Sequence, residues 1–340
     1  MEAKNIDNSK KYRLDETDSI DFNGHTLYRI VALKDFSDVK AGDKGGYIES
    51  EDNLSHEGAA WVYDNAQVWG EAYIYGNAHI NGNAHVSGNA HVGGKSEVSG
   101  HAEVSGKARI SENAYISGSS LISGLANISG NAHIKDNAQV GGFSWVYDDA
   151  WIFDNAKVYD NARVSDEVRI YNNAHINGNA HVSGNAHVGG KSEVSGHAEV
   201  SGKARISDNS KISGSSLIGG LANISGNAQI SDNAQVRDNA DVEDNAKVYG
   251  NAQVGGFSWV YDNAKVYDNA HVSGNAQVYG RAHISGYTQI AGDAEISGDG
   301  ELNVNDTITE DVVLNSDRNN SASESESLSV EESRRKGLSR

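Results

Sequence analysis

The chain of 340 residues contains no cysteine and no proline. The absence of cysteine excludes disulfide bonds, thiolate nucleophiles and cysteine-ligated metal centres. The absence of proline leaves a donor on every peptide nitrogen, which suits a protein whose backbone is held in β-ladders. No long apolar run and no signal peptide are found, so neither a membrane span nor secretion is expected. These absences together predict a cytoplasmic protein without membrane contact.

Positive charge is also scarce in this chain. The sequence carries 28 Lys and Arg residues against 47 Asp and Glu residues, which gives a net charge of −19 at pH 7. The acidic residues are spread along the chain and form no dense block. Nucleic acids and anionic membranes are bound through clustered Lys and Arg, so the sequence predicts neither as a partner.

A six-residue repeat dominates the rest of the sequence. From Val62 to Ile296 every sixth residue is Val or Ile, forty times in succession, and a small residue usually lies two positions earlier. Side chains alternate across a strand, so these two positions share the inner side while the polar positions around the aliphatic residue face outward. Gly or Asp, and then Asn, fill the remaining positions. Gly and Asn tolerate the positive φ that a tight corner between strands requires.

Six residues therefore make one side and one corner of a coil, and three sides close a triangular coil of eighteen residues. The repeat predicts an all-β fold, the left-handed parallel β-helix typical of hexapeptide-repeat solenoids. Forty sides correspond to about 13 coils, and a strand spacing of about 4.8 Å gives a prism about 60–65 Å long. Each residue is expected to stack on the residue eighteen positions later.

The ends of the chain depart from the repeat. Asn23 and Gly24 separate two apolar alternating segments, which predicts a β-hairpin that caps the open end of the solenoid. From residue 316 the chain is rich in Ser and Glu and predicts a disordered tail. The expected organisation is a flexible N-terminus (1–18), a hairpin cap and connector (19–59), the β-helix (60–299), an irregular C-terminal cap (300–315) and the tail (316–340).

A longer repeat lies over the hexapeptides. Residues 76–134 return almost unchanged at 172–230, shifted by 96, and residues 141–148 return at 255–262, shifted by 114. Both shifts leave a remainder of six when divided by eighteen. Each copy is therefore expected on the next face of the prism, so the copies do not form one continuous stripe.

The segment from Asp35 to Gly42, followed by Gly45-Gly46-Tyr47, Asn53-Leu54-Ser55 and Trp61-Val62-Tyr63-Asp64, resembles a bacterial hexapeptide-repeat family, the YdcK-like proteins. The specific resemblance covers about residues 27–70. The resemblance implies a β-helix and an acetyltransferase activity that is attributed to the family from its fold. In hexapeptide acyltransferases as a class, acyl-CoA binds between the subunits of a trimer and a His acts as general base.

Histidine is common in the repeat, but its spacing argues against catalysis. Nine histidines occupy the outward position before the aliphatic residue: His79, His85, His91, His133, His175, His181, His187, His271 and His283. None of them has another His eighteen residues away, so they are expected to form neither a metal cluster nor a catalytic triad. His25 and His56 lie outside the strict repeat and are the two candidate catalytic bases. No loop interrupts the repeat to shape an acyl-CoA cleft. No cofactor or metal is therefore expected, except acetyl-CoA if the protein is an acyltransferase.

The outward aromatic residues gather on one face. The face that contains Val62 carries nine of them, against four on each of the other two faces: Trp61, Tyr63, Tyr115, Trp151, Phe153, Tyr171, Trp259, Tyr261 and Tyr279. Aromatic ladders are enriched in contact surfaces. They also stabilise a sheet by about 0.2–1 kcal/mol per cross-strand pair, so stability alone is the competing interpretation.

The unbroken coils favour a rigid, non-catalytic scaffold or interaction protein that self-associates through this candidate contact face, for which a trimer is one expected state. The first alternative is a trimeric acyl-CoA-dependent acyltransferase, which rests on the fold class and the family resemblance. The second alternative is a structural β-helix that polymerises end to end.

Overall fold

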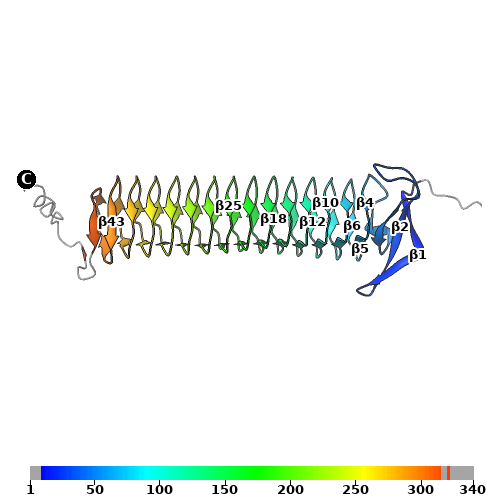
Figure 1. Ribbon diagram of the computed structural model, residues 1–340, viewed down its shortest axis with the longest axis horizontal. Helices are drawn as coiled ribbons and strands as arrows, with labels where there is room; N and C mark the ends of the chain where they lie inside the picture. Colours follow the sequence, from blue (N-terminus) through cyan, green and yellow to red (C-terminus); the bar gives the residue numbers. More distant parts are fainter. Residues whose placement is uncertain (1–8, 315–319, 322–340) are drawn as a thin grey trace, which may run out of the picture.

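The computed structural model describes residues 9–314 and 320–321 and forms one long triangular prism with a hairpin at its N-terminal end (Figure 1). From β4 (Trp61–Val62) to β40 (Gln277–Val278) a two-residue strand recurs every six residues. The C-terminal strands are β41 (His283–Ser285), β42 (Gln289–Ile290), β43 (Glu295–Gly298), β44 (Glu301–Asn303), β45 (Thr307–Ile308), β46 (Val312–Leu314) and β47 (Asn320–Ser321). The predicted hexapeptide-repeat, left-handed parallel β-helix is thereby confirmed.

Every third strand pairs in parallel to build three sheets, each forming one face of the prism. The β4 face has 15 strands and runs from β4 to β46, and the β6 face has 14 strands and runs from β6 (Tyr73–Ile74) to β45. The β5 face contains β5 (Gln67–Val68) and counts 18 strands, because four further strands join it: β1 (Tyr12–Phe22), β2 (His25–Ala32), β3 (Lys44–Ile48) and β47. Partners lie eighteen residues apart in the main repeat, as in the pairing of Val62 with Ile80.

The aliphatic residue and the small residue two positions before it fill the interior. Val62, Ile80 and Ala78 are fully buried, and the same holds for nearly all of their counterparts along the prism. The fifteen strands of the β4 face exceed the expected 13 coils, because β44, β45 and β46 extend the three faces. Leu302 and Ile308 pair at the eighteen-residue spacing, whereas Ile296 pairs with Val312, only sixteen residues later. The segment expected as an irregular cap at 300–315 therefore adds a strand to each face and departs from the regular spacing in β46.

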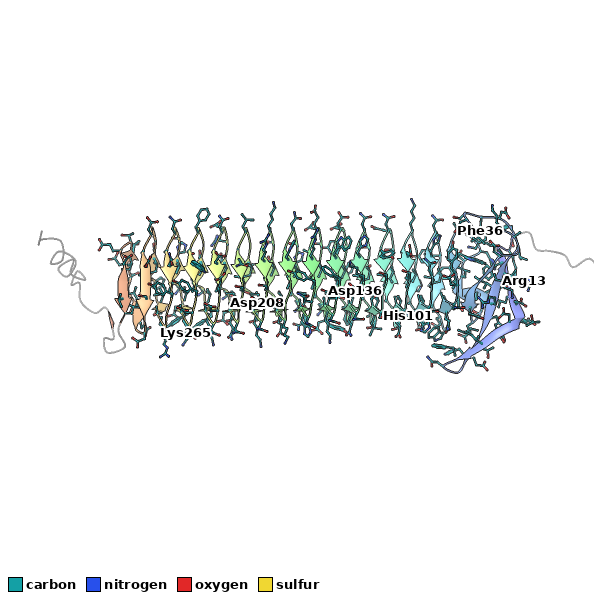
Figure 2. All side chains as sticks on the ribbon, viewed as in Figure 1. Arg13, Phe36, His101, Asp136, Asp208 and Lys265 are labelled. Atoms are coloured by element: carbon teal, nitrogen blue, oxygen red, sulfur yellow. The ribbon has the colours of Figure 1, made fainter. Side chains whose placement is uncertain are left out.

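The corners differ from the prediction in one respect. The positive φ lies at the residue two positions after the aliphatic position, mostly Gly or Asp, for example Asp160 (φ 59°) and Gly178 (φ 65°). Among the described Asn residues, Asn23 and Asn172 have positive φ. An acidic corner residue also accepts a hydrogen bond from the next coil: Asp160 Oδ2 lies 3.0 Å from the Gly178 backbone nitrogen. Figure 2 shows such side chains, Asp136 and Asp208 among them, along the outside of the prism. Part of the acidity of the chain is thus structural.

At several corners the Asn that follows the corner residue is hydrogen-bonded to the Asn of the next coil. The Asn209 side chain donates to Asn227 at 3.3 Å, and Asn227 donates in turn to Asn245 at 3.0 Å. A second run joins Asn233, Asn251 and Asn269. The amides therefore link neighbouring coils by side-chain hydrogen bonds, which explains their recurrence better than backbone conformation does.

The N-terminal hairpin consists of β1 (Tyr12–Phe22) and β2 (His25–Ala32), joined at Asn23 and Gly24, which both have positive φ. Both positive φ values are those of the tight turns that hairpins prefer. β3 (Lys44–Ile48) pairs antiparallel with β2 and parallel with β5, so it connects the hairpin to the prism. β1 begins at Tyr12, and the boundary expected at residue 18 therefore lies inside a strand.

The cap satisfies the open edge of the first coil. Along the prism, backbone N–H groups donate to the following coil, as in the bond from Trp61 to Ala78, so the first coil presents carbonyl groups without donors. The buried Lys11 ammonium donates to the Ala60 carbonyl at 2.7 Å, and the Tyr12 hydroxyl donates to the Leu54 carbonyl at 2.8 Å. Such groups would otherwise be buried without partners, at a cost of about 1–3 kcal/mol each.

The 3₁₀ turn η1 (Glu51–Asn53) completes this cap. The buried Asn53 amide donates to the carbonyls of Gly70 and Ala72, both at 2.9 Å. The expected Ser/Glu-rich tail lies outside the described residues except for β47. Within the described part of the chain, no helix has the length and apolar character needed to cross a membrane.

Candidate functional site

The β4 face carries an aromatic column over consecutive coils. Tyr115, His133 and Trp151 lie in the paired strands β13 (Tyr115–Ile116), β16 (His133–Ile134) and β19 (Trp151–Ile152). The His133 and Trp151 rings stack with centroids 4.2 Å apart, and Tyr115 lies 5.6 Å from His133. Burial lowers the pKa of His133, and the neighbouring Lys135 acts in the same direction. The imidazole is therefore neutral at pH 7 and packs as an aromatic ring.

A second column lies beside the first on the same face. The Lys135 ammonium lies 5.2 Å from the ring centroids of both Trp151 and Phe153. Phe153 stacks on Tyr171 of the next coil with centroids 5.5 Å apart. All of these rings are partly exposed. The result is a continuous surface of five rings and one cation over four coils, which combines the residue types that dominate contact surfaces.

Stacked pairs also occur elsewhere, for example Tyr249 with Tyr267 on the β5 face, with centroids 4.9 Å apart. Stacking by itself therefore does not distinguish a contact surface from a stabilised strand. What sets the β4 face apart is the length of the continuous run. A second cluster on this face contains Trp259, which is 41% exposed, with Tyr261 and Tyr279 beside it.

The two N-terminal members of the predicted contact face belong instead to the cap. Trp61 is only 1% exposed, because Phe36 and Tyr12 pack against it with centroids 5.3 and 6.1 Å away. Tyr63 donates to Asp38 at 2.8 Å. The inclusion of Trp61 in an exposed contact face was therefore wrong, since the sequence pattern gives its outward direction but not the cap that covers it.

The two candidate bases have structural partners. His56 Nδ1 accepts the Lys11 backbone N–H at 3.2 Å, and its ring stacks on Tyr12 with centroids 4.4 Å apart. His25 Nδ1 lies 2.9 Å from Glu49 Oε1, and this bond holds the pKa of Glu49 below its usual value. Glu49 also accepts the Gly70 backbone N–H at 2.7 Å. Both histidines thus tie the hairpin and connector to the prism.

A small cleft that the sequence pattern did not reveal lies beneath the hairpin, which projects past the side of the prism (Figure 1). Its volume is about 160 Å³, and it is lined by Phe22, Asn23, Trp69, His85, Ser87, Glu103 and Ser105. The ring centroids of Phe22 and His85 are 4.9 Å apart. Burial lowers the pKa of His85, so this imidazole is neutral at pH 7. No sequence signal separates His85 from the other repeat histidines, because the hairpin alone singles it out.

The remaining repeat histidines stay apart, as their spacing predicts. His79 pairs with Trp61 and Glu97, and His91 pairs with Tyr73 and Arg109. In the part of the chain that the structure describes, no group of three or more His, Asp or Glu side chains is arranged to hold a metal ion.

No protein-family model matches the chain. The chain is 50% identical over 38 residues to the uncharacterised acetyltransferase YdcK of Escherichia coli K12, a match that covers 11% of this chain and 12% of that protein. This match confirms the resemblance to the YdcK-like proteins over a short segment.

Among solved structures, the chain matches a candidate acetyltransferase from Desulfovibrio desulfuricans G20. The two are 10% identical, with 58% of this chain and 66% of that chain covered, and the TM-score is 0.19. The fold assignment therefore rests on the coils described above. The chain is a hexapeptide-repeat β-helix.

Proposed function

We propose that the protein is a rigid, non-catalytic scaffold that self-associates through the β4 face. The observation that carries this proposal is the continuous surface of Tyr115, His133, Lys135, Trp151, Phe153 and Tyr171. These side chains stand on a straight sheet held in register by main-chain bonds, so they are ordered before any partner arrives. Pre-ordered aromatic groups bind with a small loss of conformational entropy.

The rest of the molecule suits such a role. The strands recur without an inserted loop from β4 to β43, so the faces of this part of the prism are built from strands and tight corners alone. Each coil contacts its neighbours alone, and stacked coils make a stiff rod. A rod with an aromatic contact surface along one face can associate side by side with other copies of the chain.

The proposal is tested by measuring mass in solution for a variant with Phe153→Ser, Tyr171→Ser and Tyr261→Ser. Loss of the aromatic anchors should weaken association by at least about tenfold, as for central interface residues. The matched control is Tyr249→Ser with Tyr267→Ser, which removes a stacked pair from the β5 face. The proposal fails if the triple variant associates like the wild type, or if both variants lose association equally.

One observation favours the acyltransferase alternative, namely the neutral His85 in the cleft beneath the hairpin. A neutral imidazole is the form that a general base needs. The test is acetyl-CoA binding and acyl transfer by the wild type, His85→Ala and His181→Ala, because His181 is the copy of His85 far from the hairpin. Saturable binding with transfer lost in His85→Ala alone would replace the scaffold proposal.

A further inference from the structure

A solvent-open depression lies beside Trp145 on the β6 face. It has a volume of about 490 Å³ and is lined by Asn89, His91, Lys107, Arg109, Leu125, Asn127, Phe143 and Trp145. Its size is in the range of ligand sites. The depression is separate from the β4 face and from the cleft beneath the hairpin.

Apolar side chains form one half of this depression. Phe143 and Trp145 belong to one coil and are 58% and 50% exposed, and Leu125 of the preceding coil is 43% exposed. Large apolar groups exposed side by side are uncommon on a protein surface and mark binding sites. The Trp145 indole ring supplies a flat face with negative electrostatic potential.

Cations form the other half. Lys107 and Arg109 are exposed side chains, and within the described residues neither lies within 4.0 Å of a carboxylate oxygen of a described partner. No acid lines the depression, although the chain has a net charge of −19. Glu71 at its rim accepts a hydrogen bond from the Asn89 amide. Two cations of one coil that lie in the same depression as exposed aromatic rings, with no acid in the lining, favour an anionic ligand.

The opposite side of Trp145 has a different character. A second depression of about 480 Å³ lies there, and its lining includes Glu112 and Asp148 as well as Arg163. Carboxylates repel an anion, so the two sides of the indole ring are electrostatically distinct. An anionic ligand would extend from Trp145 toward Arg109 and away from Asp148.

The internal duplication provides a natural comparison. Shifts of 96 and 114 carry Lys107 and Arg109 to Lys203 and Arg205, and Phe143 and Trp145 to Phe257 and Trp259. Because the two shifts differ by eighteen residues, one additional coil separates the cations from the aromatic pair in the copy. That coil brings Asp241 into the strand position directly beside Trp259. The copy keeps the residue types and loses their arrangement.

We infer that the depression binds an acidic oligosaccharide. One pyranose ring stacks its C–H face on the Trp145 indole, and the carboxylate of a neighbouring uronic acid residue binds Arg109 and Lys107. The amides of Asn89 and Asn127 can donate to and accept from the hydroxyl groups. Two coils separate the aromatic and cationic rows, about 10 Å at the spacing of β-strands. This separation fits two linked sugar rings and exceeds the reach of a single aromatic acid.

The experiment titrates the full-length protein with trigalacturonate by calorimetry and by tryptophan fluorescence, with the carboxyl-reduced neutral trisaccharide as ligand control. The expected result is one site per chain, affinity that falls with added salt, and binding of the neutral sugar at least about tenfold weaker, as for loss of a charge-assisted contact. No binding at about 10 mM ligand, where a Kd of 1 mM would be saturated, overturns the inference.

Matched variants locate the site. Trp145→Ala and Arg109→Gln should each weaken binding at least about tenfold, since each removes an anchor of the ligand. Arg205→Gln removes the copy of Arg109 and should leave affinity unchanged. An equal loss in Arg109→Gln and Arg205→Gln, or unchanged binding in Trp145→Ala, would overturn the inference. Tighter binding of an acidic peptide such as triglutamate than of trigalacturonate would also overturn it. Unchanged circular dichroism verifies that the variants fold.

Discussion

The ammonium group of Lys11 donates a hydrogen bond of 2.7 Å to the carbonyl oxygen of Ala60, in the interior of the N-terminal cap. Lys11 is 1% exposed, and burial lowers its pKa from 10.5 to about 8, with a smaller contribution in the same direction from Lys34. The residue replaces the donor that a preceding coil would supply. The protonation state of the Lys11 side chain is therefore coupled to the stability of the N-terminal end of the solenoid.

Replacement of Lys11 by Met tests this role as a function of pH. Because the folded pKa is depressed, the unfolded chain binds more protons than the folded chain between pH 8 and 10.5, and wild-type stability rises with pH in that window. The Met variant lacks this group and its pH dependence. The stability difference in favour of the wild type should therefore grow as pH rises from 8 to 10.5.

The measurement is guanidinium denaturation followed by tryptophan fluorescence, to which the buried Trp61 contributes from the cap. At high pH the neutral amine keeps its hydrogen bond without the cost of a buried charge, so the Met variant should be less stable by about 1–3 kcal/mol. A difference that is independent of pH, or that shrinks as pH rises, would contradict this account of Lys11.

Substitutions at Asp160 test whether the conformation of the acidic corner residues contributes to stability. This residue has a φ of 59° and accepts the Gly178 N–H at 3.0 Å. Asp160→Ala combines loss of the bond with left-handed strain of about 1–2 kcal/mol, whereas Asp160→Gly loses the bond without the strain. The midpoint temperature of thermal unfolding should therefore be similar for the wild type and Asp160→Gly and clearly lower for Asp160→Ala. An Ala variant as stable as the Gly variant would show that the corner geometry carries no such cost.

A substitution at Gly189 tests whether self-association depends on the positions of the rings in the contact face. A Cβ atom at this position would lie 2.5 Å from the Tyr171 ring, so Gly189→Val displaces a ring that stacks on Phe153. Gly189 directly follows β25 (His187–Val188) and does not have a positive φ, so the main chain accommodates valine and stability should change by less than about 1 kcal/mol. Self-association, measured by light scattering after size-exclusion chromatography, should weaken.

The control for Gly189 is Gly93→Val, because Gly93 is the copy of Gly189 on another face and lies under Tyr75 in the same way. This variant displaces a ring of the β6 face and should associate like the wild type. Equal weakening by both substitutions would mean that association does not depend on the β4 face.

The sequence predicted the prism well because each interior position is repeated. Val62 and Ala78 are buried for reasons of strand alternation that act locally in every coil. The contacts of the cap occur once each, so the repeat pattern could not predict that Phe36 covers Trp61 or that Phe22 covers His85. The structural role of the acidic corner residues was not predicted, for a different reason. In the sequence Asp160 is only a negatively charged residue, and its role as a hydrogen-bond acceptor depends on where the next coil places the Gly178 N–H.

The candidate contact face was predictable as a set of outward residues but not as a surface. Eighteen-residue spacing placed Phe153 against Tyr171. It did not indicate that Lys135 lies between Trp151 and Phe153, since the direction of a long side chain depends on both neighbouring coils. The depression beside Trp145 was missed for the same reason, because its lining comes from corner positions as well as strand positions.

Sedimentation velocity of the wild-type protein over a hundredfold range of concentration tests the central claim most directly. Self-association through the β4 face predicts a defined oligomer, such as a trimer, that dissociates on dilution and is shifted to monomer by Phe153→Ser, Tyr171→Ser and Tyr261→Ser. A monomer at every concentration would contradict the claim.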